Sequence, residues 1–337
     1  MRVLVPRRID GVAPDAEAPV ARLHGRSMGC DWTVSFVTGP DSDAAQLSCG
    51  IESMLADVVR QMSTWESDAA ISVFNRAAAG TWLPLPFGFA QVLACALHVA
   101  RASDGALDPT AGALTTLWGF GPAGRYHQPG FAMPAAADIE AARQRGGWHR
   151  LQVDGDAMRL HQPGGMELDL SAVAKGFAVD EVSRYLRRMG ARHHLVDIGG
   201  ELRGAGMKPD GQPWWVDVQL PSGAGAAPTS TFTRIALHDL AVATSGDYLQ
   251  GFRANGRWYS HCIDPRSGYP IDNGVCSVTV LHDECMLADA WSTALMVLGP
   301  AAGRGVAESQ QLAAQWLVRE GEGVAEHCSS AYLALVA

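Results

Sequence analysis

The hydrophobic pattern of the chain changes its period within residues 166–189. Met166, Leu168 and Leu170 alternate with polar neighbours, which predicts a short strand. The following apolar positions keep a helical spacing instead, and they are Val179, Val182, Tyr185, Leu186 and Met189. Gly190 can end this helix. A strand therefore passes into a helix near Ser171.

Other segments with clear periods predict further helices and strands. The predicted helices cover residues 43–62, 87–102, 135–145, 172–189, 285–298 and a short stretch near 301–311. The predicted strands cover residues 31–38, 193–204, 214–220, 231–237, 240–244, 275–281, 314–318 and 331–336, with a hairpin over 151–160. They alternate without a regular βαβ period, so we expect the α+β class. Residues 1–20 read as a loose arm, residues 21–337 as one globular unit, and residues 221–230 as a surface loop.

Composition and charge narrow the possible functions. A chain of 337 residues with 47% hydrophobic and 18% charged residues can bury a large core. The net charge of -9 and the lack of a basic patch argue against nucleic-acid binding. The chain has no run of about 18 uninterrupted apolar residues, so we expect no membrane insertion. The N-terminus lacks a secretory pattern, so we expect a cytoplasmic protein, or a periplasmic one if a leading segment has been removed.

The seven cysteines are widely spaced, odd in number and include no C-x-x-C pair. This spacing excludes a cysteine zinc site and a disulfide framework. We expect most of them to be small core residues, and their presence favours a reducing compartment.

The junction near Ser171 has the features of a phosphate site. A helix N-terminus offers free backbone N–H groups and the positive end of the helix dipole. Lys175 adds a positive charge about one turn into the helix, next to the permissive Gly176. An ordinary capped helix with a solvated lysine would have the same local sequence.

Asp289 and Thr293 form a second candidate site on a predicted helix. They are four residues apart and share one helical face, so a carboxylate and a hydroxyl oxygen lie about one turn apart. Mg²⁺ binds a few such hard oxygens and completes its octahedron with water and substrate phosphate. In the alternative interpretation, Thr293 bonds back to its own helix and Asp289 stabilises the helix N-terminus.

His261 stands where a predicted strand ends and the turn residues 264–268 begin. From there an imidazole can reach a cleft and accept a hydroxyl proton near neutral pH, although a lone histidine is more often structural. Residues 103–110 place Asp108 in a Gly-containing loop, and aromatic residues alternate with glycines over 118–121. These aromatics could wall a planar ligand or belong to core and turn.

Taken together, these motifs resemble one family over roughly residues 22–300. The matching blocks are residues 28–29, 62–65 with 72–75, 105–110, 117–121, 169–176, 197–201, 243–248, 260–268 and 288–293. They occur in the family's order. The chain resembles the ApbE family of FAD:protein FMN transferases.

The resemblance implies an ApbE-like, T-fold-like α+β unit with mixed and antiparallel sheets and an active site in a cleft. It implies an enzyme that uses Mg²⁺ to cleave the FAD diphosphate, releases AMP and attaches FMN through a phosphoester to a threonine of a target flavoprotein. Such phosphoryl transfer needs charge stabilisation and positioning, which the motifs above could supply.

The resemblance also assigns residues to roles. The metal would be held by the Ala172 carbonyl and by the side chains of Asp289 and Thr293. The FAD contacts would come from Met28, Trp65, Ala106, Leu107, Asp108, Asp169, Lys175 and Ile263. His261 would deprotonate the acceptor hydroxyl, and Lys175 would support the diphosphate charge.

The chain departs from the family pattern at several positions. Trp65 replaces a common tyrosine and Leu107 a common phenylalanine, and both keep a broad apolar contact. Cys30 stands where threonine is usual, and the lipobox of exported members is missing. Two other functions stay open at this point: an FAD pyrophosphatase that produces FMN and AMP, and a non-catalytic FAD-binding protein.

Overall fold

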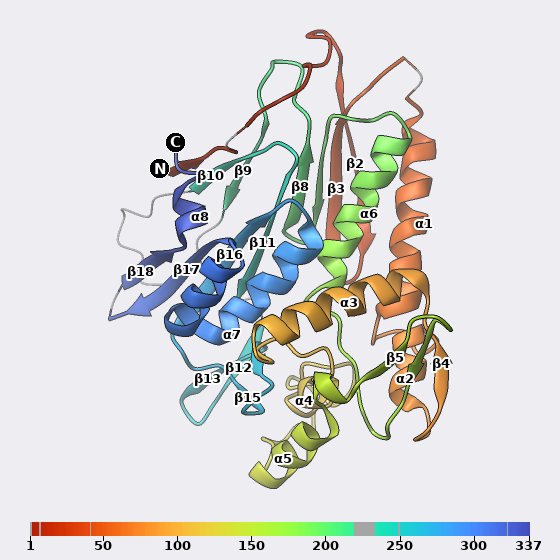
Figure 1. The fold of residues 1–337 in the computed structure, drawn as a ribbon, viewed down its shortest axis with the longest axis vertical. Helices are drawn as coiled ribbons and strands as arrows, with labels where there is room; N and C mark the ends of the chain where they lie inside the picture. Colours follow the sequence, from red (N-terminus) through yellow and green to blue (C-terminus); the bar gives the residue numbers. More distant parts are fainter. Residues whose placement is uncertain (1, 7, 41, 219–232, 249, 322) are drawn as a thin grey trace.

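A computed structural model describes the whole chain except residues 1, 7, 41, 219–232, 249 and 322. Its centre is a sheet of eight antiparallel strands (Figure 1). In spatial order these are β18 (Gly323–Cys328), β17 (Ala313–Glu320), β16 (Val275–His282), β11 (Leu240–Gly246), β8 (Glu201–Ala205), β7 (His194–Ile198), β3 (Cys30–Val37) and β2 (Val20–Ser27). The α+β class expected from the sequence is confirmed.

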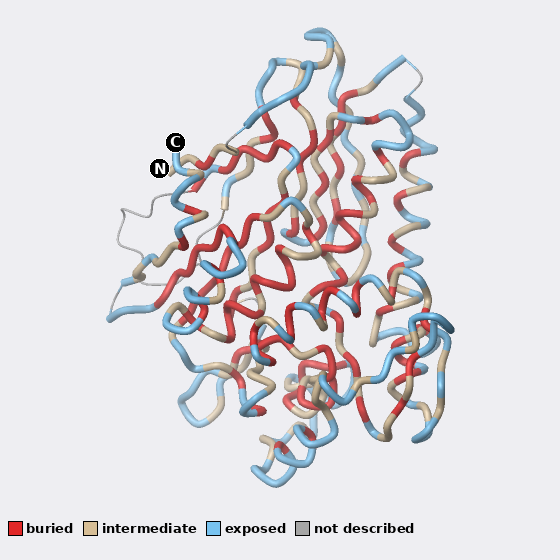
Figure 2. The backbone as a smooth tube through the Cα atoms, in the orientation of Figure 1, coloured by how far each residue is buried: buried red, intermediate tan, exposed pale blue. Residues whose placement is uncertain are grey.

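Helices cover one face of this sheet and enclose the main core. They are α1 (Ala44–Met62), α3 (Phe87–Ala102), α6 (Ala174–Arg188) and α7 (Cys285–Ser309), with α3 crossing beneath the others (Figure 1). Burial is concentrated between these helices and the strands, as the red stretches in Figure 2 show. Along β3 the inward positions Trp32, Val34 and Phe36 alternate with more exposed ones, which is the period of a strand with one covered face.

A smaller sheet closes a second core on the other side. It contains β1 (Arg2–Leu4), β10 (Thr233–Leu237) and β9 (Trp214–Val218), and it packs with α8 (Ser330–Leu333). The expected loose arm is wrong for residues 2–4, because β1 pairs with β10 and Leu4 is fully buried. The strand expected over 331–336 is also wrong. Ser329 caps a helical turn there by accepting a hydrogen bond from the Tyr332 N–H.

Short elements gather below the main sheet (Figure 1). The helical ones are α2 (Ala70–Arg76), α4 (Gly112–Leu117), α5 (Ala136–Arg145) and the 3₁₀ turn η1 (Trp148–Arg150). A three-stranded sheet joins β4 (Trp82–Pro84), β6 (Arg159–His161) and β5 (Gln152–Asp154), and two hairpins join β12 (Gly251–Ala254) to β13 (Arg257–Ser260) and β14 (Ile263–Asp264) to β15 (Tyr269–Pro270). The sequence predicted α5 and the β5–β6 hairpin but not the other elements of this group.

The structure corrects several predicted boundaries. The strand predicted over 193–204 is a hairpin that turns at Gly199 and Gly200. The helices predicted over 285–298 and 301–311 join in α7 across a kink at Gly299, whose φ is +67°, before Pro300. Residues 166–170 are extended but form only one bridge, between Ala111 and Glu167. The predicted loop 221–230 lies outside the described residues, as do 219–220 and 231–232 of the adjoining predicted strands.

Among the described residues, α7 is the one helix long and apolar enough to cross a membrane by length and composition. However, 61% of its apolar window is buried inside the protein. Its close neighbours are β11, β16, α3 and α6. It occupies the place of a core helix.

Asp180 ties α6 to two of its neighbours. Its carboxylate is fully buried, forms an ion pair with Arg203 of β8 and accepts hydrogen bonds from the N–H groups of Cys285 and Met286. It therefore satisfies two free donors at the start of α7 from another helix.

Replacing Asp180 should destabilise the fold strongly. In Asp180→Ala, Arg203 loses its partner and two buried N–H groups lose their acceptor, so we expect a loss of about 3–5 kcal/mol in the free energy of unfolding. Urea denaturation followed by circular dichroism measures this loss. The control Asp57→Ala removes an exposed pair with Arg60 and should cost at most about 1 kcal/mol. Equal losses in the two variants would contradict this role of Asp180.

Candidate active site

The junction predicted near Ser171 places an unpaired backbone carbonyl at the start of α6. The side chain of Asp169 accepts a hydrogen bond from the Ser171 N–H at 2.8 Å and fixes the turn before the helix. The Gly176 N–H, which would donate to Ala172 in a regular helix, donates to Asp289 Oδ2 at 3.0 Å instead. Within the described residues no donor bonds to the Ala172 carbonyl. This oxygen is therefore free for a ligand.

Gly176 is needed because α6 and α7 come very close at this point. A Cβ at Gly176 would lie 2.4 Å from the Cys285 carbonyl oxygen and 2.8 Å from Asp289 Cβ. Only a residue without a side chain allows the hydrogen bond between Gly176 and Asp289 to form. From the sequence alone, Gly176 is only conformationally permissive. The structure shows that glycine is required here for the close approach of α6 and α7.

Asp289 and Thr293 do not behave as ordinary helix residues. Asp289 is buried and bonds to α6 rather than to its own helix. Thr293 Oγ1 lies 3.0 Å from the Ser245 hydroxyl of β11, while the neighbouring Ser292 bonds back to the Asp289 carbonyl at 2.9 Å. The alternative interpretation of this pair, as a back-bonding threonine and a dipole-stabilising aspartate, is not what the structure shows.

Lys175 pairs with the buried carboxylate of Glu201. Its Nζ is 2.6 Å from Glu201 Oε1, and the side chain of Glu201 is 5% exposed. Burial disfavours the charged Lys175, but Glu201 and Asp289 outweigh this effect and raise the pKa of the ammonium. Burial raises the pKa of Asp289, against the effects of Lys175 and the Gly176 N–H. Lys175 is thus a permanent cation at a helix N-terminus, and the solvated-lysine interpretation fails.

The oxygens at this junction suit a hard cation. In the described part of the chain no three His, Cys, Asp or Glu side chains gather into a metal-binding group. The resemblance assigns a metal to three oxygen donors instead: the Ala172 carbonyl, the Asp289 carboxylate and the Thr293 hydroxyl, which carry a single carboxylate among them. Mg²⁺ uses such sparse oxygen sets and keeps several waters.

His261 follows β13 and is held by the chain before β12. Its Nδ1 is 3.0 Å from the Gln250 carbonyl, which can only accept, so Nδ1 carries the proton and Nε2 is the basic nitrogen. Burial lowers the pKa of His261, but Cys262 and the Gln250 carbonyl outweigh burial and raise it. The charge of Lys175 opposes this rise.

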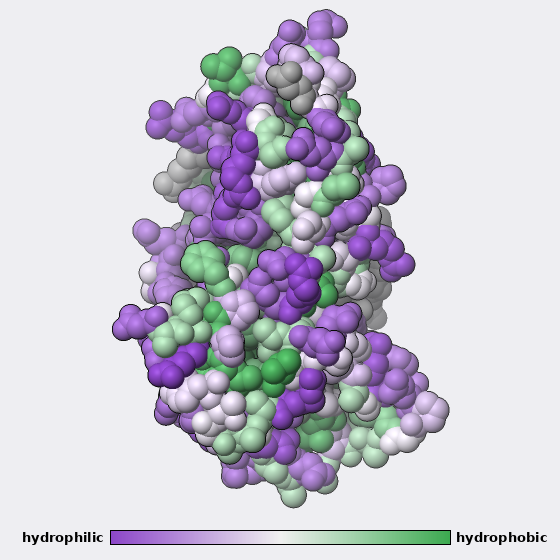
Figure 3. Space-filling model, turned by 90° about the vertical axis from the view of Figure 1, so that its right-hand side faces the viewer, coloured by the Kyte–Doolittle hydropathy of each residue, from purple (hydrophilic) through white to green (hydrophobic). Residues whose placement is uncertain are grey.

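Trp65 and Met28 lie on the side of the molecule that carries α1 and α2. The Trp65 indole is 54% exposed, and the Arg125 guanidinium covers one of its faces at 4.9 Å from the ring centroid. Met28 lines a cavity of about 840 Å³ together with residues of α1 and residues 66–70. In Figure 3, apolar surface gathers around a hollow in the lower half of this face, with hydrophilic residues around it.

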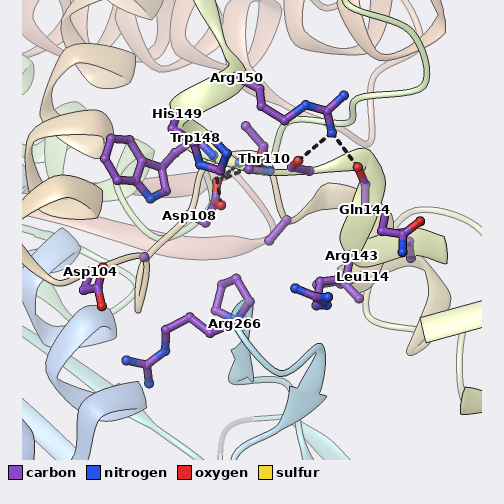
Figure 4. Close-up of a pocket in the computed structure, with 16 residues that line it drawn as sticks. Asp104, Asp108, Thr110, Leu114, Arg143, Gln144, Trp148, His149, Arg150 and Arg266 are labelled. Carbon is purple, nitrogen blue, oxygen red and sulfur yellow. Dashed lines mark hydrogen bonds between the residues drawn. The ribbon is translucent and has the colours of Figure 1, made fainter. Parts of the chain in front are cut away.

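A second cavity, of about 320 Å³, contains Asp108 but none of Lys175, His261 and Asp289 (Figure 4). The α5–η1 segment lies on one side of it, and Asp104 and Arg266 lie on the other. The Asp108 carboxylate is occupied by internal hydrogen bonds, with Thr110 N at 2.8 Å and Trp148 N at 3.1 Å. Asp108 therefore shapes the cavity wall.

The remaining predicted FAD contacts are placed unequally. Ala106 and Leu107 are 1% and 4% exposed, so their side chains pack inside the protein. Asp169 is joined to the Asp108 loop, because its N–H donates to the Pro109 carbonyl at 2.9 Å. Ile263 packs against the smaller apolar cluster that contains Trp118 and Phe120.

Sequence reasoning gave no role to four residues that support this site. Glu201 stood in a quoted motif without an assigned role. Ser245 and Gln250 act through contacts made only in the folded chain, and Arg125 stands in a loop without a motif. The one signal in the sequence was Glu201 itself, an acidic residue directly after Gly199 and Gly200 in a predicted strand.

Comparison with known proteins identifies the family. The profile of the ApbE family matches residues 28–316. The chain is 36% identical to a FAD:protein FMN transferase of Vibrio cholerae over 94% of this chain and 93% of the relative, and 33% identical to one of Haemophilus influenzae over 98% and 95%. The crystal structure of the Pseudomonas stutzeri flavinyl transferase ApbE, in its apo form, matches with a TM-score of 0.85 and 38% identity over 94% of this chain and 97% of that one.

The fold and these relatives define an enzyme of the transferase class. The chain belongs to the ApbE family.

A side chain added at Gly176 should force α6 and α7 apart. In Gly176→Ala the new Cβ would clash with the Cys285 carbonyl and Asp289, and overpacking of this kind costs about 1–3 kcal/mol of unfolding free energy. The control Gly305→Ala meets no atom within 4 Å and should be neutral or stabilising by up to about 1 kcal/mol. Thermal unfolding of both variants checks the difference, and an unchanged Gly176→Ala would contradict the close contact.

Proposed function

We propose that this enzyme transfers FMN from FAD to the threonine hydroxyl of a partner flavoprotein, with Mg²⁺ bound, and releases AMP. The observation that carries the proposal is the free Ala172 carbonyl beside Asp289 and Lys175 at the N-terminus of α6. This arrangement offers a hard-cation site and a fixed positive charge at the positive end of a helix dipole, which together suit a diphosphate. The names of the relatives support the flavin substrate and the protein acceptor.

In this proposal the metal is held by the Ala172 carbonyl, Asp289 and Thr293. When bound, Mg²⁺ neutralises charge on the diphosphate and on the departing AMP. Lys175 supplies a second positive charge that does not depend on the metal. Ser245 orients the Thr293 hydroxyl, and Gly176 orients the Asp289 carboxylate.

His261 takes the proton of the acceptor. The threonine oxygen attacks the phosphorus of the FMN half, the bond from that phosphorus to the AMP oxygen breaks, and the hydroxyl proton passes to His261 Nε2. The Gln250 carbonyl keeps the Nδ1–H tautomer that this step needs. AMP leaves with the electron pair of the broken bond.

The other residues that the resemblance assigns to FAD would bind its flavin and nucleotide parts. The uncovered face of Trp65 can stack on the isoalloxazine, while Met28 borders the cavity next to it. Asp169 and Ile263 would contact the nucleotide from the lower elements, whereas Asp108, whose carboxylate is bonded to Thr110 and Trp148, would shape the wall beside it. Ala106 and Leu107 are buried and would contribute through their backbone.

One incubation separates the proposed reaction from its alternatives. The enzyme is mixed with FAD, Mg²⁺ and an acceptor flavoprotein domain that carries one threonine, and a Thr→Ala domain serves as the control. We expect the acceptor to gain the mass of FMN minus water and AMP to appear in equal amount. Free FMN at the full rate without acceptor would indicate a pyrophosphatase, and tight FAD binding without AMP would indicate a carrier; either result would overturn the proposal.

Removing the charge of Asp289 should abolish the metal-dependent step. Asp289→Asn keeps the shape of the side chain but loses its negative charge, so AMP release at fixed Mg²⁺ should fall at least about a hundredfold. Chromatographic detection of AMP measures the rate, and circular dichroism verifies the fold. Undiminished AMP release would remove Asp289 from the metal site.

Transfer should depend on pH through His261. Since the pKa of the imidazole is raised above its ordinary 6.5 and the base must be neutral, kcat should fall as the pH drops through that raised value and level off above it. His261→Ala should slow transfer by about 10²–10⁴-fold and remove this acid limb. A pH–rate profile of both proteins tests the assignment. An unchanged acid limb in the variant would assign it to another group.

A further inference from the structure

Glu201 is buried by the turn that precedes it. The turn residues Gly199 and Gly200 have φ values of +66° and +101°, and Asp197 Oδ1 accepts the Gly200 N–H at 3.0 Å. A Cβ at Gly199 would come within 2.8 Å of Cys30 Sγ. The two glycines therefore allow the sharp turn from β7 into β8, with Cys30 packed against it. Glu201, the first residue of β8, is only 4% exposed.

The carboxylate of Glu201 uses only one of its oxygens. Oε1 lies 2.6 Å from Lys175 Nζ, whereas Oε2 is buried and has no hydrogen-bond partner within the described residues. A buried carboxylate oxygen without a donor is costly. The molecule therefore has a place for one donor that the described residues do not supply.

We propose that Glu201 is a positioning residue that holds the Lys175 ammonium beside Asp289 and accepts, at Oε2, a hydrogen bond from a water of the hydrated divalent cation. The inference rests on the proposed function. Lys175 has a flexible four-carbon stem and three donors, so one bond to Glu201 fixes its direction and leaves two donors for the diphosphate.

The charges around the site favour this role. Asp289 contributes the one carboxylate of the proposed metal site, and Mg²⁺ retains waters that need acceptors around them. Burial and the nearby charge of Asp289 raise the pKa of the Glu201 carboxyl, and the paired Lys175 opposes this rise. An apolar pair would satisfy packing at lower cost than this buried ion pair, so packing does not account for it.

The test compares wild type with Glu201→Gln, which keeps the size of the side chain but loses its charge. We expect kcat to fall about 10–100-fold with little change in the KM for FAD, as is usual for residues that orient a metal site's ligands. The affinity for Mn²⁺, titrated by electron paramagnetic resonance without FAD, should fall about tenfold. The variant Glu201→Asp retains the charge and should recover part of both losses.

A double-mutant cycle shows whether Glu201 acts through Lys175. Adding Glu201→Gln to Lys175→Met should lower kcat clearly less than it lowers the kcat of wild type, because the lysine that Glu201 positions is already gone and only the bond to the metal-bound water is left to lose. The matched control is Asp247→Asn, which weakens the partly buried pair of Asp247 with Arg319. This control should lower the unfolding temperature but leave kcat and Mn²⁺ affinity unchanged.

The outcomes distinguish this inference from the function it rests on. If Glu201→Gln keeps both kcat and Mn²⁺ affinity, or if its kcat loss is equally large in the Lys175→Met background, the positioning role is overturned. If wild type releases no AMP from FAD with Mg²⁺, the proposed function fails. In that case the Mn²⁺ titration still decides about Glu201, because it needs no turnover.

Discussion

The hydrogen bond from the Gly176 N–H to the Asp289 carboxylate is the contact on which the rest of the site depends. It joins the N-terminus of α6 to the buried side of α7 across a gap that only glycine can occupy. The same bond takes the N–H away from the Ala172 carbonyl and orients the carboxylate. A single contact therefore creates two of the three proposed metal ligands.

This contact lies in a buried site, where electrostatic interactions are stronger than in water. Two carboxyl groups, Glu201 and Asp289, are buried near the ammonium of Lys175, and in such surroundings charges act strongly on one another. The protein keeps them there because α6, α7 and β8 are fixed by the large core around them. Asp180 and Arg203 add a second buried ion pair between the same elements. The site is thus rigid, and its unpaired oxygens point to a ligand that completes it.

The small elements below the sheet connect the proposed base His261 with the proposed flavin contact Trp65. Phe252 and Tyr259 stack at 5.4 Å between ring centroids, and Phe120 lies 6.3 Å from the His261 ring. The loop that follows Phe120 carries Arg125 onto Trp65. One aromatic cluster and its loop therefore connect the proposed base with the exposed indole, although these residues are far apart in sequence.

Local sequence determined the long helices and most strands of the large sheet. Their apolar periods reflect a single buried face, so α1 and α3 could be placed within one residue. The motif order also identified Lys175, Asp289, Thr293 and His261 as candidate site residues. Short elements such as β1, β18 and α8 were missed or mistaken, because their pairing partners or caps lie outside the local pattern.

Only the tertiary structure decided how these candidates act. The sequence could name Ala172 and Gly176 by resemblance, but the free carbonyl exists because Asp289, over a hundred residues away, accepts the helical N–H. It could likewise not show that Glu201 pairs with Lys175, that Gln250 sets the tautomer of His261, or that the Asp108 carboxylate bonds to the Trp148 N–H. Periodicity reports which face of an element is buried. The packing of whole elements decides which distant group bonds to a given donor or acceptor. The chemistry of this site depends on those long-range bonds.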